Sequence, residues 1–483
     1  MSGILVVDIG TSSVRASVVR PDGSVHHEHR RATLPDSPAA GLVEFDAAAL
    51  AAAVLEVAHA TIADVGAGEV DAVGIANQRA STVVWDRATG EPLAPALGWQ
   101  DLRTIGTCLE MQAKGHRLAP NASATKASHL LDQVDPDRAR DLCIGTVDTW
   151  IAWSLSNGAM HVIDATNAGV TALTTRDGSE WDPVVLADLR IPESMLPRIV
   201  DSSGVLGEAT ALPGAPPIAG IAGDQQASLL GQGCIEPGIA KITFGTGGML
   251  DMVLGEERPG FQQRGGAGCF PIVARRLAGE TTWGIEAVML SAGTNVEWLR
   301  DDLGLIPTSD ASHELAASVP DSGGAWYVPA LLGLGTPHWD YGARGSLFGV
   351  TRGTTAAHVV RAVLEGIAHR GADLVEAAVV DGGHAIESIR IDGGMSANPT
   401  FVQALADTTQ RRVEVSPVLE ATTLGAAFLA GVAVGTWGSL AEAAATWQPA
   451  RTIDPAAETD RARWAEAVRR TQAWIPELSA FDF

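Results

Sequence analysis

Cysteine is scarce in this 483-residue chain, and basic residues are far outnumbered by acidic ones. The four cysteines lie far apart without a Cys-x-x-Cys pair, which argues against a zinc site or a disulfide scaffold and predicts buried, reduced thiols. They are Cys108, Cys143, Cys234 and Cys269. The net charge of −24, from 33 Lys and Arg against 57 Asp and Glu, argues against a nucleic-acid-binding surface. Local groups must therefore capture any anionic substrate against the overall field.

Targeting segments and long hydrophobic runs are missing as well. The N-terminus passes directly into the apolar residues 4–7 and Asp8, without a basic start, a long apolar stretch or a cleavage site. The run at residues 424–434 is too short and too rich in Gly and Ala to cross a bilayer. We therefore expect a soluble cytoplasmic protein with no membrane and no nucleic-acid partner. The sequence leaves open whether identical subunits assemble into a homo-oligomer.

Two familiar nucleotide-binding patterns are also absent. The chain has no GxxxxGK[ST] phosphate loop and no HRD motif followed by DFG. A bound nucleotide would need other turns to hold its phosphates.

Such turns are present at the ends of two apolar strands. Residues 4–8 run into Gly10-Thr11-Ser12-Ser13, and residues 240–244 run into Gly245-Thr246-Gly247-Gly248. Backbone N–H groups in turns of this kind can bind phosphate. A third apolar stretch ends in Asp224-Gln225-Gln226, where an isolated carboxylate can take a proton. Together these features indicate phosphoryl transfer from a nucleotide to a hydroxyl group, although a strand-end Asp-x-Gly-Thr is by itself usually an ordinary turn.

The length exceeds what one hydrophobic core usually supports, so we expect two α/β domains. The rigid Pro-rich break at residues 213–217 favours a boundary near residue 233, giving domains at 1–233 and 234–483. A strand meander is expected at the N-terminus, and apolar residues at helical spacing predict a long amphipathic helix over residues 355–380. The two similar strand–turn sequences suggest a duplicated domain with a nucleotide cleft between the halves.

Two other groups of residues have more than one interpretation. The cluster His26-His27-Glu28-His29 could bind a metal, but an exposed hairpin strand is favoured. Arg79 and Trp99 could be a packed surface pair, or they could offer directed donors and an apolar wall to a polyhydroxy ligand. Spacing alone does not decide between the two interpretations of this pair.

Several stretches in succession resemble the FGGY carbohydrate kinases, and within them the glycerol-kinase branch. The similarity covers nearly the whole chain in order. The stretches are Gly74-Ile75-Ala76-Asn77-Gln78-Arg79, Trp99-Gln100-Asp101, Gly145-Thr146-Val147-Asp148-Thr149-Trp150, Asp164-Ala165-Thr166-Asn167-Ala168, residues 220–226, residues 333–340, residues 343–353, and Asp392-Gly393-Gly394 with Asn398.

The resemblance implies the actin-like ATPase fold, in which two ribonuclease-H-like domains close on ATP and Mg²⁺. It places Asp224 as the general base and Asp8 as the residue that holds the metal through water. By position it also implies the remaining contacts. Substrate-binding positions are Arg79, Ala80, Trp99, Asn121, Asp224, Gln225 and Met249; nucleotide-binding positions are Thr11, Ser12, Ser13, Arg15, Thr246, Gly247, Gly293, Glu297, Gly394 and Asn398.

Three of these positions depart from the glycerol-kinase pattern. Glycerol kinases carry Glu where this chain has Ala80, Tyr in the stretch that includes Asn121, and Phe beside the second turn, where Met249 stands. Losing groups that hydrogen-bond a ligand usually costs discrimination. We therefore expect a roomier pocket that prefers a four- or five-carbon polyol or ketose over glycerol.

The predicted function is an ATP-dependent kinase that phosphorylates a hydroxyl of a small polyol or sugar. Glycerol kinase proper is one alternative. A non-catalytic actin-like ATPase or a sensor pseudokinase is another, and it would not need Asp224 and Gln225 together with Arg79 and Trp99.

Overall fold

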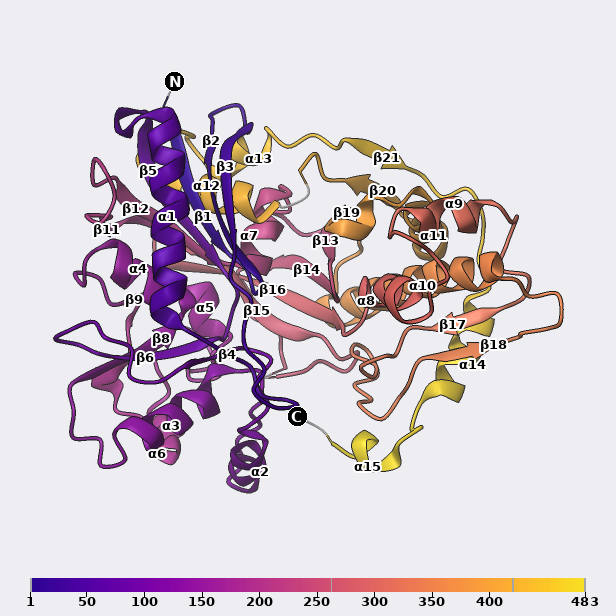
Figure 1. Cartoon of the computed structure of the whole chain (residues 1–483), viewed down its shortest axis with the longest axis horizontal. Coiled ribbons are helices and arrows are strands. Elements are labelled where there is room, and N and C mark those ends of the chain that lie inside the picture. The colour runs from indigo at the N-terminus through magenta and orange to yellow at the C-terminus, as the bar shows by residue number, and fades with distance from the viewer. Residues whose placement is uncertain (1, 262, 419–420, 482–483) are drawn as a thin grey trace.

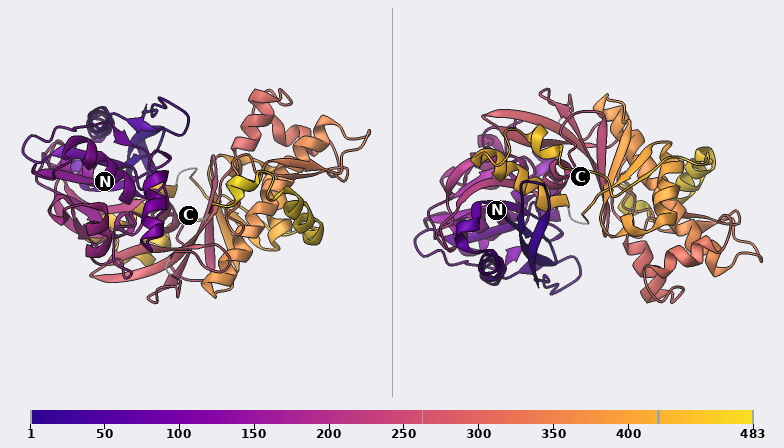
Figure 2. Two further views of the ribbon diagram at one scale, coloured as in Figure 1. Left: turned by 90° about the horizontal axis from the view of Figure 1, so that it is seen from below. Right: turned by 90° about the horizontal axis from the view of Figure 1, so that it is seen from above.

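A continuous 13-stranded sheet runs through the protein and connects its two lobes (Figure 1). The computed structural model describes residues 2–261, 263–418 and 421–481. The strand order is β21-β20-β19-β13-β14-β16-β15-β11-β12-β5-β1-β2-β3. Figure 2 shows the indigo-to-magenta and orange-to-yellow lobes, with magenta strands between them.

Twelve strands precede residue 233, and nine follow it in the described part of the chain. The first set is β1 (Gly3–Ile9), β2 (Ser13–Val19), β3 (Val25–Ala32), β4 (Glu44–Phe45), β5 (Val70–Asn77), β6 (Thr82–Asp86), β7 (Ala96–Leu97), β8 (Leu142–Thr146), β9 (Val162–Asp164), β10 (Arg198–Val200), β11 (Ser203–Glu208) and β12 (Pro217–Gly223). The second set is β13 (Ile239–Phe244), β14 (Gly248–Gly255), β15 (Phe270–Leu277), β16 (Glu280–Met289), β17 (Trp326–Val328), β18 (Ser346–Phe348), β19 (Ser388–Asp392), β20 (Arg412–Val415) and β21 (Arg451–Ile453).

Helices cover the sheet and fill the connections between strands. They are α1 (Ala47–Val65), α2 (Ile105–Ala113), α3 (Ser123–Val134), α4 (Val147–Leu155), α5 (Ala165–Gly169), α6 (Pro183–Leu189), α7 (Asp224–Gly231), α8 (Thr294–Glu297), α9 (Ala311–Ala317), α10 (Ala356–Gly382), α11 (Pro399–Thr409), α12 (Ala421–Val434), α13 (Leu440–Ala444), α14 (Arg461–Thr471) and α15 (Pro476–Ser479).

Three parallel strands of the first lobe end at the same level. Strands β1 and β12 flank β5, and their residues are apolar and almost wholly buried, as in a sheet covered on both faces. Ile9 lies opposite Asn77, and Asn77 lies opposite Gly223. The residues that follow these strands therefore meet at one edge, where α/β sheets usually bind ligands.

The second lobe repeats this arrangement with β13 and β19. These strands are parallel, and Thr243 lies opposite Asp392 at their carboxyl ends. The turns that begin at Gly245 and Gly393 therefore lie side by side. A Cβ on Gly393 would come within 2.5 Å of the Phe244 carbonyl oxygen, so this approach requires glycine.

Most of the predicted elements are confirmed. β1, β2 and β3 form the N-terminal meander, the long amphipathic helix is α10, and His26 to His29 lie in hairpin strand β3. All four cysteines are buried and free. The domain division at residue 233 stays a prediction. Helix α12 from the second part of the chain packs on the strands of the first lobe, with Leu424 and Phe428 in one cluster with Ile4 and Ala219.

One helix in the described part of the chain, α1, is long and apolar enough to cross a membrane. Its buried residues Leu50, Val54 and Val57 belong to the core cluster that also contains residues of β1, β2 and β5. The helix is thus accounted for as a core element of the first lobe.

Helices α7 and α12 cross with their backbones in contact. A Cβ on Gly425 would overlap the carbonyl group of Ala227, and one on Gly231 would overlap the carbonyl oxygen of Ala421. Glycine at both positions lets the two helices approach more closely than side chains would allow. Because α7 begins at Asp224, this contact also sets the position of the predicted base.

We expect Gly425→Ala to lower the stability of the protein by about 1–3 kcal/mol or more, because the added methyl group meets backbone that cannot move aside. Thermal or urea unfolding measures the change. Gly106→Ala in α2 is the matched control, because a Cβ there meets open space. That variant should gain up to about 1 kcal/mol. Equal stability of the two variants would contradict the close approach.

Candidate active site

Asp224 follows β12 and opens helix α7 at the shared strand edge. Its Oδ1 accepts a hydrogen bond of 2.8 Å from the backbone N–H of Gln225, and about 30% of its side chain is exposed. The carboxylate is therefore held in place and still accessible to a small ligand.

The guanidinium of Arg79, which follows β5, lies between two carboxylates. Its Nη2 is 2.7 Å from Oε2 of Glu286 on β16, and its Nε is 3.4 Å from Oδ1 of Asp224. Burial by itself lowers the pKa of Arg79, but the nearby carboxylates outweigh burial and raise it. Arg79 is therefore a permanent cation that joins the end of β5 to strand β16 of the second lobe.

The pKa of Asp224 is raised as well, but here burial is the cause. Burial raises the pKa of Asp224, and the positive charges of Arg79 and Lys241 oppose this shift without cancelling it. A carboxyl group with a raised pKa is a stronger base than an ordinary aspartate.

A second ion pair lies behind Gln225. Lys241 on β13 and Asp251 on β14 are both fully buried, with Nζ and Oδ2 2.7 Å apart. Lys241 also donates to Oε1 of Gln225 at 2.5 Å and to Oγ1 of Thr243 at 3.0 Å. Met249 lies opposite Thr243 in the strand register, so it shares the face of β14 that carries Asp251.

Trp99 connects residues predicted to bind the substrate with a residue predicted to bind phosphate. Its indole Nε1–H donates to Oγ1 of Thr11 at 3.1 Å, and its backbone N–H donates to Ser81 Oγ at 3.0 Å. Its carbonyl accepts from Lys126 Nζ and from Asn121 Nδ2, each at 3.2 Å. Asn121 is exposed, and its side chain holds the backbone of the loop that carries Trp99 (the tryptophan loop).

Ala80 has a left-handed backbone, with φ at +63°, and is buried. Its carbonyl accepts hydrogen bonds of 3.2 Å from the hydroxyls of Thr82 and Ser123. A non-glycine residue in this region is strained, and such strain persists only where the surroundings fix the backbone. The loop after Arg79 is therefore held in one shape by its neighbours.

The first glycine turn is closed by a hydrogen bond of 3.0 Å from the Gly10 N–H to the Ser13 carbonyl. Thr11 is half-buried, Ser12 is exposed and Ser13 is buried. Asp8 and Arg15 pair across the two strands, with Oδ2 and Nε 3.3 Å apart. The turn therefore presents backbone and hydroxyl groups beside one nearly buried carboxylate.

The second glycine turn lies against the start of α8. The N–H of Gly293 donates to Gly245 O, and the N–H of Ala292 donates to Thr246 O, both at 2.8 Å. A Cβ on Gly247 would approach the Met289 carbonyl oxygen within 2.7 Å. The turn is thus packed directly on the loop that follows β16.

The other predicted nucleotide positions lie around this turn. Glu297 ends α8 and is exposed, and Gly394 opens a short 3-10 turn with open space around its Cα. Asn398 caps α11 by accepting from the N–H of Phe401 at 3.1 Å, and it donates to Ser312 Oγ at 2.9 Å. Part of its hydrogen-bonding capacity is therefore used within the protein.

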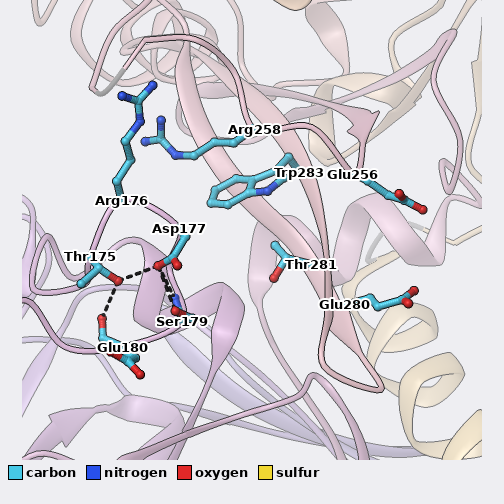
Figure 3. Close-up of a pocket in the computed structure, with 10 residues that line it drawn as sticks. All are labelled: Thr175, Arg176, Asp177, Ser179, Glu180, Glu256, Arg258, Glu280, Thr281 and Trp283. Carbon is cyan, nitrogen blue, oxygen red and sulfur yellow. Dashed lines mark hydrogen bonds between the residues drawn. The ribbon is translucent and has the colours of Figure 1, made fainter.

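A separate cavity of about 970 Å³ opens where loop 175–180 meets the β15–β16 hairpin (Figure 3). Arg258 lies over the indole of Trp283 at 5.3 Å, and Arg176 Nη2 donates to Gly260 O at 2.9 Å. None of its lining residues is a predicted site residue. The hydrogen bond of Arg176 connects the two lobes at a second place.

Comparison with known proteins agrees with this geometry. Residues 3–231 match the N-terminal domain of the FGGY family of carbohydrate kinases, and residues 240–434 match its C-terminal domain. The chain belongs to the FGGY family. It is 44% identical to the glycerol kinase of Aromatoleum aromaticum, over 98% of this chain and 100% of the relative. It is 42% identical to the glycerol kinase of Trichlorobacter lovleyi, over 98% of this chain and 99% of that relative.

Solved structures of FGGY kinases confirm the predicted fold. The glycerol kinase of Plasmodium falciparum with ADP has a TM-score of 0.89 and 28% identity, with 98% of each chain covered. A xylulose kinase from Brucella ovis has a TM-score of 0.84 at 24% identity, with 99% of each chain covered, and supports the fold alone. The protein therefore has the two-domain actin-like ATPase fold. It is an ATP-dependent kinase that acts on an alcohol group of a polyol or sugar.

Among the residues expected at the site, the structure joins Arg79 to Asp224, and Trp99 to Thr11 and Asn121. It adds three charged residues to them. Glu286, Lys241 and Asp251 were not predicted as site residues. Each is a charged residue between apolar neighbours in a strand, a pattern that normally excludes charge unless it is paired. That signal in the sequence could have identified them, although it does not reveal their partners.

The pH dependence of kcat/KM should show an acid limb that belongs to Asp224. The base must be ionised, so activity should fall as pH falls through its pKa, which burial places above the ordinary aspartate value. Initial rates in overlapping buffers, with recovery checked at neutral pH, measure this limb. If the residual activity of Asp224→Asn shows the same limb, another group is responsible.

Proposed function

We propose that Asp224 is the general base in transfer of the γ-phosphoryl group of ATP to a terminal hydroxyl of a small polyol or sugar. The observation that supports this role is a carboxylate held at the strand edge, partly exposed and with a raised pKa, beside Arg79. One glycine turn follows β1, which pairs with β5, and the other follows β13, which pairs with β19. Backbone N–H groups in such turns can bind phosphates.

In the proposed step, the acceptor oxygen attacks the γ-phosphorus. A new oxygen–phosphorus bond forms while the bond to the bridging oxygen of ADP breaks, and the hydroxyl proton passes to Asp224. Proton transfer to a positioned base accelerates such steps by about 10²–10⁴-fold. The remaining acceleration comes from positioning and from groups that stabilise charge on the phosphoryl oxygens.

The nucleotide phosphates would be bound between the two turns. Thr11, Ser12, Ser13 and Arg15 would contact them from the first lobe, and Thr246 and Gly247 from the second. Gly293, Glu297, Gly394 and Asn398 surround the second turn and would hold the nucleoside. Because these loops are fixed by backbone hydrogen bonds, little reorganisation is needed when ATP binds.

Asp8 is the proposed carboxylate for Mg²⁺. It is nearly buried at the end of β1 and already neutralises part of the charge of Arg15. In the described residues, no group of three or more His, Cys, Asp or Glu could hold a metal. This fits an ion bound mainly by phosphates and water, as Mg²⁺ often is. When bound, Mg²⁺ would neutralise developing charge on the phosphates.

For the acceptor, we propose a four- or five-carbon polyol or ketose. Arg79, Asp224 and Gln225 supply polar contacts, and Trp99 supplies an apolar wall. Ala80 brings no carboxylate, Asn121 holds the tryptophan loop, and Met249 replaces an aromatic ring, so the pocket is wider than a glycerol-specific one. Glycerol is the second candidate, favoured by the relatives named glycerol kinase.

The remaining expectations belong to the same proposal. We place the domain boundary near residue 233, with domains 1–233 and 234–483, and we place the enzyme in the cytoplasm. The family matches support this boundary because they end at residue 231 and resume at residue 240.

Asp224→Asn should lower kcat by at least about 10²-fold, because the amide cannot take the hydroxyl proton. ADP release measures kcat, and titration calorimetry should show ATP binding largely unchanged. Asp188→Asn is the matched control, because that carboxylate pairs with Lys114 and His116 away from the site. Near-normal turnover of Asp224→Asn would remove Asp224 from this role.

A substrate panel tests the acceptor. We expect kcat/KM for erythritol, a pentitol or a pentulose to exceed that for glycerol, because the widened pocket leaves a three-carbon chain loosely held. The assay is ADP release with Mg-ATP. A clear preference for glycerol would establish the second candidate. If no alcohol in the panel stimulated ADP release, the result would contradict the kinase proposal.

A further inference from the structure

The buried lysine of the second lobe has an unusual set of partners. Lys241 Nζ contacts Asp251 Oδ2 at 2.7 Å, Gln225 Oε1 at 2.5 Å and Thr243 Oγ1 at 3.0 Å. An ammonium group has three N–H donors and no acceptor. Two of these contacts are hydrogen bonds and the third is an ion pair, so three oxygen atoms hold the lysine in place.

This arrangement determines which way the amide of Gln225 faces. The two ends of a glutamine amide are often interchangeable, but only the oxygen can face a lysine. The NH2 group must then point away from Lys241. Within the part of the chain that the structure describes, this NH2 group makes no hydrogen bond. Gln225 is half-buried.

Gln225 lies among charged residues of the proposed acceptor site. Gln225 follows Asp224, Asp224 contacts Arg79, and Arg79 contacts Glu286. Glu286 lies directly opposite Asp251 in the strand register, and Asp251 pairs with Lys241, which returns to Gln225. These residues form a closed ring of contacts and strand neighbours at the proposed acceptor site.

We propose that the Lys241–Asp251 pair is a positioning device, which fixes Gln225 as a hydrogen-bond donor to the acceptor substrate. The recipient is an oxygen on the carbon adjacent to the one that bears the hydroxyl facing Asp224. Both a hydroxyl and a ketose carbonyl can accept this bond, so the device suits polyols and 2-ketoses alike. This inference rests on the proposed function, which already gives Gln225 a substrate contact, and adds Lys241 and Asp251 as the residues that orient it.

A stabilising role alone explains the pair less well. Replacing a buried ion pair with apolar residues of similar size is often neutral or stabilising. A charged pair between the apolar neighbours Ile242, Leu250 and Met252 therefore indicates a requirement other than stability. Orienting Gln225 is a requirement that an apolar pair could not meet.

The double variant Lys241→Met/Asp251→Leu removes both charges together, so neither is left unpaired. We expect KM for the best acceptor to rise about tenfold, the effect of losing one well-placed hydrogen bond. KM for ATP and the melting temperature should stay near those of the wild type. The matched control is Arg390→Met/Glu414→Leu, a half-buried pair of 3.0 Å on the same sheet, which should leave the acceptor KM unchanged.

Gln225→Glu provides a second test in case the double variant folds poorly. Its carboxylate can still pair with Lys241 but presents no donor, so the acceptor KM should rise by a similar factor. Combining Gln225→Glu with the double variant should add little, because both changes remove the same bond. Full additivity would contradict a shared function.

A chemical control separates this contact from general damage. Glycerol and 1,3-propanediol differ by the oxygen on the central carbon, and each can be measured as a substrate or as a competitive inhibitor. The substitutions should raise the KM or inhibition constant of glycerol and leave that of 1,3-propanediol unchanged. An equal effect on both, or an acceptor KM within about twofold of the wild type, would overturn the inference. Wild-type ADP release tests the kinase proposal separately.

Discussion

A single buried cation determines how the two lobes meet at the active site. The guanidinium of Arg79 leaves the end of β5 and must find negative charge, because an uncompensated charge in a protein interior is costly. It finds Asp224 on the first lobe and Glu286 on the second. This contact joins the proposed base to the ring through Asp251 and Lys241.

Features encoded by neighbouring residues could be predicted from the sequence. The apolar strands, the glycine turns after Asp8 and Phe244, and the carboxylate at Asp224 are local patterns, and the family resemblance gave them roles and a fold. The partners of Arg79 and Gln225 could not be predicted in this way, because Glu286 and Lys241 reach them from other strands. Their contacts depend on which strands are neighbours in the sheet, and residues adjacent in the sequence do not reveal this.

Two of the residues that depart from the glycerol-kinase pattern also affect the backbone of the loops around the acceptor site. Ala80 lies on a strained, left-handed backbone, and Asn121 supports the loop of Trp99 with Lys126. The acceptor site is therefore shaped by how its loops are held as well as by which side chains line it. Changing specificity at these positions would require compatible changes in the backbone that supports them.

Helix α12 affects the order in which the polypeptide can complete its fold. The first lobe leaves the ribosome early, but one face of its sheet is covered by residues 421–434. Until that helix has been synthesised, Ile4, Ala219 and Leu230 lack their final packing partners. Exposed apolar surface on a nascent chain promotes aggregation. Completion of the first lobe must therefore wait until most of the chain has been made, despite its N-terminal position.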